Sequence, residues 1–216
     1  MPRHGKKHQY PPHEIPYLAN IWAFKSLGVK RIIAPCAVGS LKSKIKPGDF
    51  VICDQFINFS TGRGDTFYDG PKVSHVSLAN PYCHDLRKIS YSECEKFGAR
   101  THKKGTLIVI SGPRFSTKAE SGFFSKIGDI INMTAYPEVV LAREQGMCYL
   151  NVALVTDYDA GLLGSPNVKA VTTEDVTEIF RKNSEMTKKI VFSIIEKASD
   201  NPTCDCSSHI NRAFFN

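Results

Sequence analysis

Three groups of residues at the ends of apolar runs could carry chemistry together. They are Phe115 with Ser116, Met133 with Thr134, and Thr156, Asp157 and Asp159. The Phe115 ring offers a flat apolar face to a heterocyclic base, and the Thr and Ser hydroxyls can donate hydrogen bonds to an anion. Asp157 or Asp159 could accept a hydrogen bond from an exocyclic amine or, when protonated, donate one to a ring nitrogen of a leaving base.

A cation and a segment of small residues suit a phosphate group. Arg3 supplies a forked set of donors, and His4 follows it directly. Residues 35–40, which include Cys36 and Ala37, are expected to form a loop whose backbone N–H groups a ligand can approach. The sequence therefore predicts a small anionic ligand here.

Each of these features also has an ordinary structural explanation. Phe115 alone is more often a core residue than a stacking platform, Arg3 could belong to a frayed basic terminus, and residues 157–159 could form a simple Asx turn. By themselves, composition and spacing support an α/β domain that binds a small anion.

The elements that must position these residues alternate between strands and helices, which predicts an α/β fold with a mixed central sheet flanked by helices. Helices are expected at 16–27, 85–97, 139–145 and 172–197, and strands at 31–34, 50–57, 107–110, 129–134 and 150–155. The last helix opens with a capping-box pattern from Thr172 to Asp175. Ligands of open α/β sheets bind outside the carboxyl ends of strands, where the polar groups are expected to meet.

The composition is that of one globular domain, residues 1–198, followed by a polar tail, 199–216. The chain has 216 residues, 42% of them hydrophobic and 23% charged, and a formal net charge of +7. The basic residues are spread along the chain without a recognisable nucleic-acid motif, so we expect no nucleic-acid partner. No apolar run approaches the ~18 residues typical of a membrane span, and no signal segment opens the chain, so a cytoplasmic protein is expected.

Seven cysteines are present, and five of them stand in apolar contexts typical of buried free thiols. The other two, Cys204 and Cys206, form a C-D-C motif in the tail. Because no second Cys/His cluster lies near them in the sequence, we do not expect a zinc site; a reversible or intersubunit disulfide, or no special role, is favoured.

The motifs PRHG, CAVGSL, PGDFVICDQFI, SHVSLANPYC, GTLIVISGPRFSTKAES, INMTAYPEVVLARE and VTDYDA resemble, in this order, those of the methylthioadenosine phosphorylases. The resemblance covers residues 2–197 and is highly specific. It implies a trimeric purine nucleoside phosphorylase that cleaves 5'-methylthioadenosine with inorganic phosphate, in purine and methionine salvage. The products are adenine and 5-methylthioribose 1-phosphate. No metal or organic cofactor is implied.

The resemblance also implies roles for single residues. The implied phosphate ligands are Arg3, His4, Cys36, Ala37 and Thr134. The implied base and ribose contacts are Phe115, Ser116, Met133, Thr156, Asp157 and Asp159, with Asp157 as the acid that protonates the departing adenine. His75 resembles a histidine that reaches into the 5' pocket of a neighbouring subunit, and Val176 resembles an apolar residue lining that pocket. A homotrimer or a dimer of trimers is therefore expected.

Three departures from the family pattern leave alternatives open. The family has a strand and a Gly-rich phosphate loop before its PRHG motif, so N-terminal strands are expected to be missing here. Cys36 replaces a hydroxyl residue, and residues 160–164 differ from the aromatic-containing segment of the family. The alternatives are a 6-oxopurine nucleoside or methylthioinosine phosphorylase and a catalytically impaired nucleoside-binding subunit. Ser116 and Asp157 favour adenine, because the 6-oxopurine enzymes carry Glu and Asn at these positions.

Overall fold

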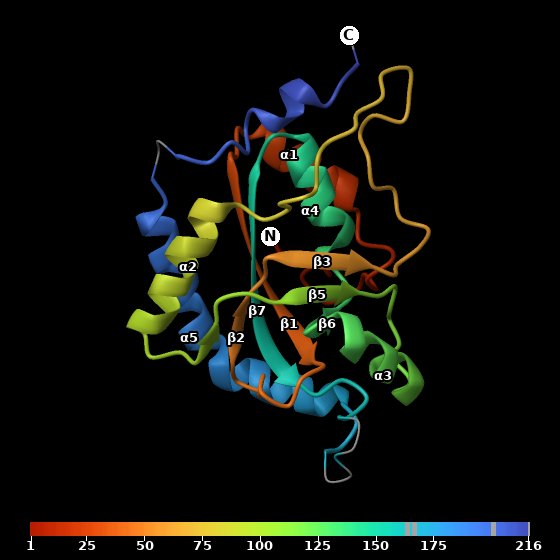
Figure 1. Ribbon diagram of the computed structural model, residues 1–216, viewed down its shortest axis with the longest axis vertical. Coiled ribbons are helices and arrows are strands. Elements are labelled where there is room, and N and C mark those ends of the chain that lie inside the picture. The colour runs from red at the N-terminus through yellow and green to blue at the C-terminus, as the bar shows by residue number, and fades with distance from the viewer. Residues whose placement is uncertain (163–164, 166–167, 200–201, 216) are drawn as a thin grey trace.

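The computed structural model describes residues 1–162, 165, 168–199 and 202–215, and its centre is a mixed seven-stranded sheet (Figure 1). The strand order is β3-β5-β6-β1-β7-β2-β4. The strands are β1 Arg31–Ser40, β2 Phe50–Ile52, β3 Gln55–Asn58, β4 Thr101–His102, β5 Thr106–Val109, β6 Ile130–Asn132 and β7 Cys148–Asp157. The two longest strands, β1 and β7, lie parallel at the centre, whereas β6 and β2 run antiparallel to them. The predicted α/β fold with a mixed sheet is confirmed.

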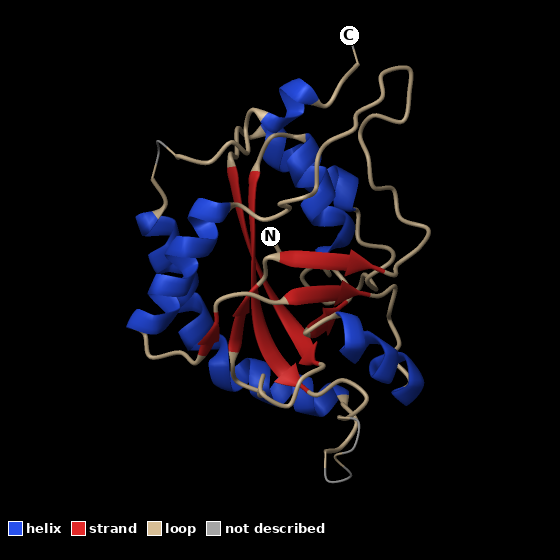
Figure 2. Ribbon diagram, viewed as in Figure 1, coloured by secondary structure: helices blue, strands red, loops and turns tan. Residues whose placement is uncertain are grey.

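Helices cover both faces of the sheet (Figure 2). They are α1 Tyr17–Ser26, α2 His84–Lys96, α3 Lys118–Ile127, α4 Ala135–Glu144 and α5 Thr173–Lys197, with a short 3₁₀ helix, η1, at His209–Arg212. The helices α2 and α5 contact each other and β7 on one side, and α1 pairs with α4 on the other. The capping box predicted for the last helix is present, because the Thr172 hydroxyl accepts from the Asp175 N–H and the Asp175 carboxylate accepts from the Thr172 N–H.

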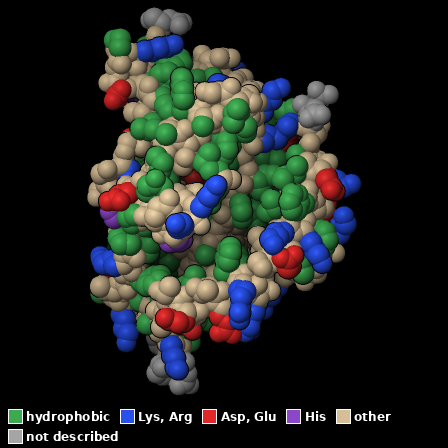
Figure 3. All heavy atoms as spheres, turned by 180° about the vertical axis from the view of Figure 1, so that it is seen from behind, with side chains coloured by type: hydrophobic (Ala, Val, Ile, Leu, Met, Phe, Trp, Pro, Cys, Tyr) green, Lys and Arg blue, Asp and Glu red, His purple; other side chains and the backbone are tan. Residues whose placement is uncertain are grey.

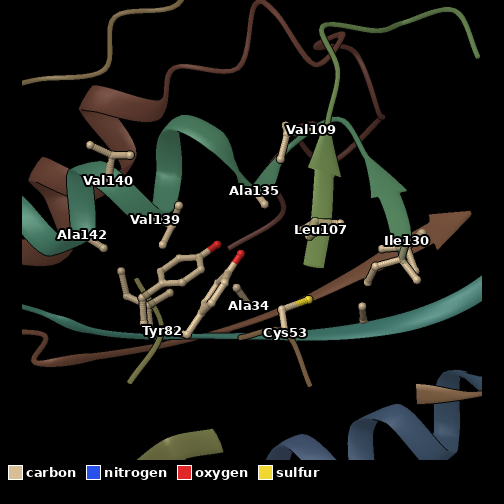
Figure 4. Close-up of a cluster of buried hydrophobic side chains, with 14 of the residues drawn as sticks. Ala34, Cys53, Tyr82, Leu107, Val109, Ile130, Ala135, Val139, Val140 and Ala142 are labelled. Atoms are coloured by element: carbon tan, nitrogen blue, oxygen red, sulfur yellow. The ribbon is translucent and has the colours of Figure 1, made fainter. Parts of the chain in front are cut away.

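Two apolar cores fix the helices to the sheet. One core joins α1 and α4 to the sheet through side chains such as Ile21, Val139 and Leu107, and part of it is shown in Figure 4. The other joins α2 and α5 to the opposite face through Leu86 and Ile194. Since β7 is buried along almost its whole length, its last residues are held rigidly at the carboxyl end of the sheet.

Two strand predictions were wrong. Residues 35–40 do not form a loop, because β1 continues to Ser40 and pairs with β7 up to Gly39 and with β6 at Gly39 and Ser40. Residues 50–57 do not form one strand, because the chain bends after Ile52 and places β2 and β3 on opposite sides of the β1–β7 pair. The bend is held by the Asp54 side chain, which accepts a hydrogen bond of 3.0 Å from the Gly105 N–H.

Other elements differ in extent from the prediction. The helix α3 was missed, although Thr117 and Glu120 form a complete capping box before it. The apolar face of α5 is buried at Ile190 and Ile194, whereas Phe180 remains 46% exposed. The segment expected as a polar tail packs against the domain in its described part, where Ala213 is buried and its carbonyl accepts from the His75 N–H at 2.7 Å.

Candidate active site

At the carboxyl ends of β1 and β7, the side chains of Asp157 and Asp159 lie against Gly39. Gly39 pairs with Asp157 across a register shift after Val38. A side-chain Cβ on Gly39 would lie 2.8 Å from Asp157 Oδ1 and 3.2 Å from Asp159 Cβ. The absence of a side chain at Gly39 therefore lets the two carboxyl groups lie directly against the β1 backbone.

Asp157 is a carboxyl group in a largely desolvated position. The Thr156 hydroxyl donates to Asp157 Oδ2 at 2.7 Å, and the Asp159 N–H donates to Asp157 Oδ1 at 2.7 Å. Burial raises the pKa of Asp157 to about 6, and the nearby carboxylates of Asp159 and Asp175 add to the rise against the opposing effect of these hydrogen bonds. At pH 7 such a group is protonated in about a tenth of the molecules, which suits a general acid.

Asp159 lies beside Asp157 and is itself 3% exposed. Burial raises its pKa, whereas the hydroxyls of Ser121 and Ser116 oppose the rise. Among the described residues, neither Asp159 Oδ2 nor Ser116 Oγ has a hydrogen-bond partner of good geometry. Buried polar atoms without a partner are costly, and a ligand with matching donors and acceptors would remove this cost.

The segment before α5 returns to the same site. The Val171 N–H donates to the Asp159 carbonyl at 2.8 Å. The charge of Asp175, in the first turn of α5, affects the pKa of Asp157. Val176 lies in the same turn and is half-buried, so the start of α5 borders the carboxyl pair. The segment 160–164 differs from the family pattern, and its residues 163 and 164 lie outside the described residues.

Arg3 lies in a buried ion pair rather than in a frayed terminus. Its Nε donates to Glu138 Oε2 at 2.7 Å, a terminal nitrogen donates to Glu138 Oε1 at 2.8 Å, and the other donates to the Pro35 carbonyl at 3.1 Å. The Tyr149 hydroxyl donates to the same Glu138 carboxylate at 2.8 Å. This network fixes the guanidinium next to Cys36, in the middle of β1.

The other expected phosphate ligands lie near this network or on the adjacent strands. Cys36 donates to the Asn151 side chain at 3.3 Å, and burial raises the pKa of its thiol. Ala37 is the next residue of β1. Thr134 is the buried N-cap residue of α4, and its hydroxyl makes no capping hydrogen bond within the described chain. His4 is less buried, and its Nδ1 lies 2.8 Å from the Tyr10 carbonyl.

Phe115 lies on the loop after β5 and Met133 directly after β6; β6 pairs with β1, and β5 pairs with β6. The Phe115 residue is 40% exposed, which is compatible with a ring that packs against a bound ligand. Arg63, which the sequence did not single out, donates to the Met133 carbonyl and the Ser111 carbonyl at 2.8 Å each. Arg63 therefore ties together the backbones that carry Phe115 and Met133.

His75 was expected to be a site residue, but within its own chain it lies apart from the other expected site residues. It lies exposed in the long connection between β3 and α2, and its ring packs on Phe215 with centroids 5.3 Å apart. In Figure 1 this connection and the C-terminal segment lie at one end of the molecule, and the carboxyl end of β7 lies at the other.

Gly39, Arg63 and Glu138 are the site residues that sequence reasoning missed. Glu138 stands in the motif INMTAYPEVVLARE, but no local pattern connects it with Arg3, which is 135 positions away. A buried glutamate on a helix with an otherwise apolar face is the signal that could have indicated an ion-pair partner.

The surface does not carry a single basic face in the view of Figure 3, where Lys and Arg side chains are interrupted by Asp, Glu and apolar groups. Within the described residues, none of the helices has the length and hydrophobicity needed to cross a membrane.

Comparison with known proteins gives a consistent assignment. The family model for the phosphorylase superfamily matches residues 1–196. The S-methyl-5'-thioadenosine phosphorylase of Pyrococcus abyssi is 50% identical over 214 residues, which are 99% of this chain and 81% of that protein. The enzyme of the same name from Nitrosopumilus maritimus is 47% identical over 216 residues, 100% of this chain and 80% of that protein.

Solved structures share the fold. Methylthioadenosine phosphorylase from Schistosoma mansoni in complex with adenine superposes with a TM-score of 0.92 at 33% identity, covering 99% of this chain and 82% of that chain. A variant of adenosine/methylthioadenosine phosphorylase from the same organism, in complex with methylthioadenosine, superposes with a TM-score of 0.90 at 34% identity, with coverages of 99% and 82%.

Proposed function

The chain belongs to the phosphorylase superfamily and, within it, to the S-methyl-5'-thioadenosine phosphorylases, and we propose that it cleaves the N-glycosidic bond of 5'-methylthioadenosine with inorganic phosphate. A phosphate oxygen attacks the anomeric carbon while the bond to the base breaks, and the bonding electrons leave with the base. The products are adenine and 5-methylthioribose 1-phosphate, which place the reaction in purine and methionine salvage.

We assign phosphate binding to Arg3, His4, Cys36, Ala37 and Thr134. The guanidinium of Arg3 keeps its positive charge near the strand while Glu138 holds its orientation. Thr134, immediately before α4, adds a hydroxyl that makes no capping hydrogen bond within the described chain. Preorganised donors of this kind stabilise an anion without reorganisation during the reaction.

We assign the base to Asp157, Asp159, Ser116, Thr156 and Phe115, with Met133 against the ribose. A protonated Asp157 can donate to a ring nitrogen of adenine through its O–H and accept from the 6-amino group through its other oxygen. A 6-keto oxygen would meet that acceptor unfavourably, so adenine is preferred. The unpartnered Ser116 Oγ and Asp159 Oδ2 supply a further donor and acceptor for the base.

The observation that carries this proposal is the half-buried Asp157, which lies beside the buried Asp159 and whose pKa is raised to about 6 by desolvation. The test is adenine release from 5'-methylthioadenosine by the purified chain with and without phosphate. We expect release that depends on phosphate and a phosphorus-containing sugar product. Equal release in phosphate-free buffer would indicate a hydrolase and contradict the proposal.

Gly39→Ala should lower kcat/KM about 10- to 100-fold, because the new Cβ displaces a carboxyl group that must be placed accurately. Gly64→Ala is the matched control, since its Cβ would meet the flexible end of the Leu18 side chain. Both variants are measured by steady-state kinetics together with their melting temperatures. Kinetics of Gly39→Ala that match those of the control would mean that Gly39 does not position Asp157.

We also propose a homotrimer or a dimer of trimers, in which His75 completes a neighbouring subunit's 5' pocket together with Val176. The exposed position of His75, away from the site of its own chain, supports this arrangement. Light scattering should therefore give a mass of three or six times 24.0 kDa. His75→Ala should raise KM for 5'-methylthioadenosine without dissociating the oligomer. A monomer at working concentrations would contradict the arrangement.

We propose a cytoplasmic location. None of the seven cysteines, which all lie in the described part of the chain, forms a disulfide bond, as expected in a reducing compartment.

A further inference from the structure

Four cysteines from three distant parts of the chain meet at the end of the sheet opposite the active site. They are Cys83, Cys148, Cys204 and Cys206, and their sulfur atoms all lie within 4.8 Å of one another. Cys148 Sγ and Cys204 Sγ are 3.4 Å apart. Cys83, Cys148 and Cys206 are between 1% and 6% exposed, so the four-thiol cluster is closed to bulk water on most sides.

The surrounding backbone holds each of these cysteines in place. Cys83 is the N-cap residue of α2, and its N–H donates to the Tyr149 carbonyl at 2.9 Å. Cys148 is the first residue of β7, and its N–H donates to the Lys30 carbonyl at 2.9 Å. The cluster thus has two ligand positions on rigid elements that are fixed independently of the tail.

The C-D-C segment is brought to these positions by Asp85, in the first turn of α2. The Asp85 carboxylate accepts from the N–H of Thr203 at 2.8 Å and from the N–H of Cys204 at 2.9 Å. It also accepts from the Thr203 hydroxyl at 3.0 Å. A carboxylate that binds two successive N–H groups fixes the direction in which the next side chains leave the backbone.

We propose that the four-thiol cluster binds one zinc ion. Four cysteine sulfurs in a closed, tetrahedral arrangement form a typical structural zinc site, with Zn–S bonds of about 2.3 Å and hence sulfur atoms about 3.8 Å apart. The 3.4 Å between Cys148 Sγ and Cys204 Sγ, and the upper limit of 4.8 Å for all the pairs, are compatible with that value. Four thiolates around one Zn²⁺ leave two negative charges. The cavity beside Cys83 and Cys148 is lined by the cations Arg31, Lys88 and Lys197 and by the carboxylates Asp85 and Glu93, so positive charges exceed negative ones in its lining.

The role of this ion is structural. Cys148 begins β7 and Asp157 ends it, so the cluster and the candidate acid lie about 30 Å apart at the rise of an extended strand. The zinc ion joins the C-terminal segment to α2 and β7. The sequence argued against zinc because the two tail cysteines have no partner nearby in the chain; the fold supplies Cys83 and Cys148 as those partners.

The test is the zinc content of the full chain purified in the presence of zinc and then freed of excess metal. We expect about one zinc ion per chain by elemental analysis. The double substitution Cys204→Ser with Cys206→Ser should remove it and lower the melting temperature. Cys94→Ser, which removes a buried thiol outside the cluster, should leave the zinc content unchanged. A double variant that retains zinc would overturn the proposal.

Two measurements on the unaltered chain do not depend on how the variants fold. After denaturation with a chelator and without reductant, all seven cysteines should react with a thiol reagent. Cobalt added to the metal-free chain should give the intense visible absorption of a tetrahedral tetrathiolate. Three reactive thiols in the same denatured sample would mean that the cluster is two disulfides, and this result, or a chain that binds no zinc or cobalt, would overturn the proposal.

Discussion

Asp157→Asn should lower kcat for 5'-methylthioadenosine by about 10²- to 10⁴-fold, the usual contribution of a general acid. An amide cannot supply the proton that the departing adenine needs, although it fills the same space and its single oxygen can still accept from either the Thr156 hydroxyl or the Asp159 N–H. Steady-state kinetics at saturating phosphate measure the loss. A variant that keeps more than a third of the wild-type kcat would show that Asp157 is not the acid.

The same substitution should stabilise the ligand-free protein at pH 8. The pKa of Asp157 is about 6 in the folded chain, against an ordinary value of 3.8 for an aspartate in an unfolded chain. The folded state therefore holds this proton more tightly than the unfolded state, and stability falls as the pH rises from about 4 to about 6. Replacing the carboxylate by a neutral amide should recover about 1 to 3 kcal/mol of the unfolding free energy. Denaturant unfolding at pH 5 and pH 8 should show a larger gain at pH 8, and a loss of stability at pH 8 would contradict this reading.

Glu138→Ala should destabilise the fold by about 3 to 5 kcal/mol, the usual cost of removing one partner from a buried ion pair. The Glu138 side chain is 8% exposed and that of Arg3 18%. The substitution leaves the guanidinium without its carboxylate and the Tyr149 hydroxyl without its acceptor. We expect the melting temperature to fall by about 10 °C. The KM for phosphate should also rise, because Arg3 is no longer held against β1.

Glu185→Ala is the matched control for Glu138→Ala. It breaks the ion pair between Glu185 and Lys188. The side chain of Glu185 is 74% exposed and that of Lys188 is 63% exposed. Exposed pairs of this kind contribute less than about 1 kcal/mol. If the two substitutions lower the melting temperature equally, the Arg3–Glu138 pair does not stabilise the fold in the way its burial indicates.

The local signals in the sequence predicted the helices α1, α2, α4 and α5 and the strands with β-branched runs, but α3 was missed in spite of its capping box. The prediction failed where a distant partner decides the conformation. Residues 35–40 contain Pro35 and Gly39, which are typical of a loop, but pairing with β7 keeps the segment extended. The run 50–57 is apolar except at Asp54 and Gln55. The hydrogen bond that bends it there comes from Gly105, 51 positions away from Asp54.

The same contrast between local signals and distant partners applies to the candidate site. The polar residues after each apolar run could be selected from the sequence, and the structure brings Ser116, Asp157 and Asp159 together. Their ion-pair and packing partners could not be selected, because Arg3 and Glu138 are joined across 135 positions. The four-thiol cluster likewise joins Cys83 to Cys204 through the positions of α2 and the C-terminal segment, which no spacing rule for zinc ligands describes.

The most direct test of the central claim is the ratio of kcat/KM for 5'-methylthioadenosine to that for 5'-methylthioinosine, measured on the unaltered chain and on Asp157→Asn at saturating phosphate. If Asp157 reads the 6-amino group and protonates the base, the unaltered chain should favour the adenine substrate by at least about 100-fold. The ratio should fall sharply in Asp157→Asn, since an amide can donate to the 6-keto oxygen. A ratio near one, or a ratio that the substitution leaves unchanged, would contradict the account.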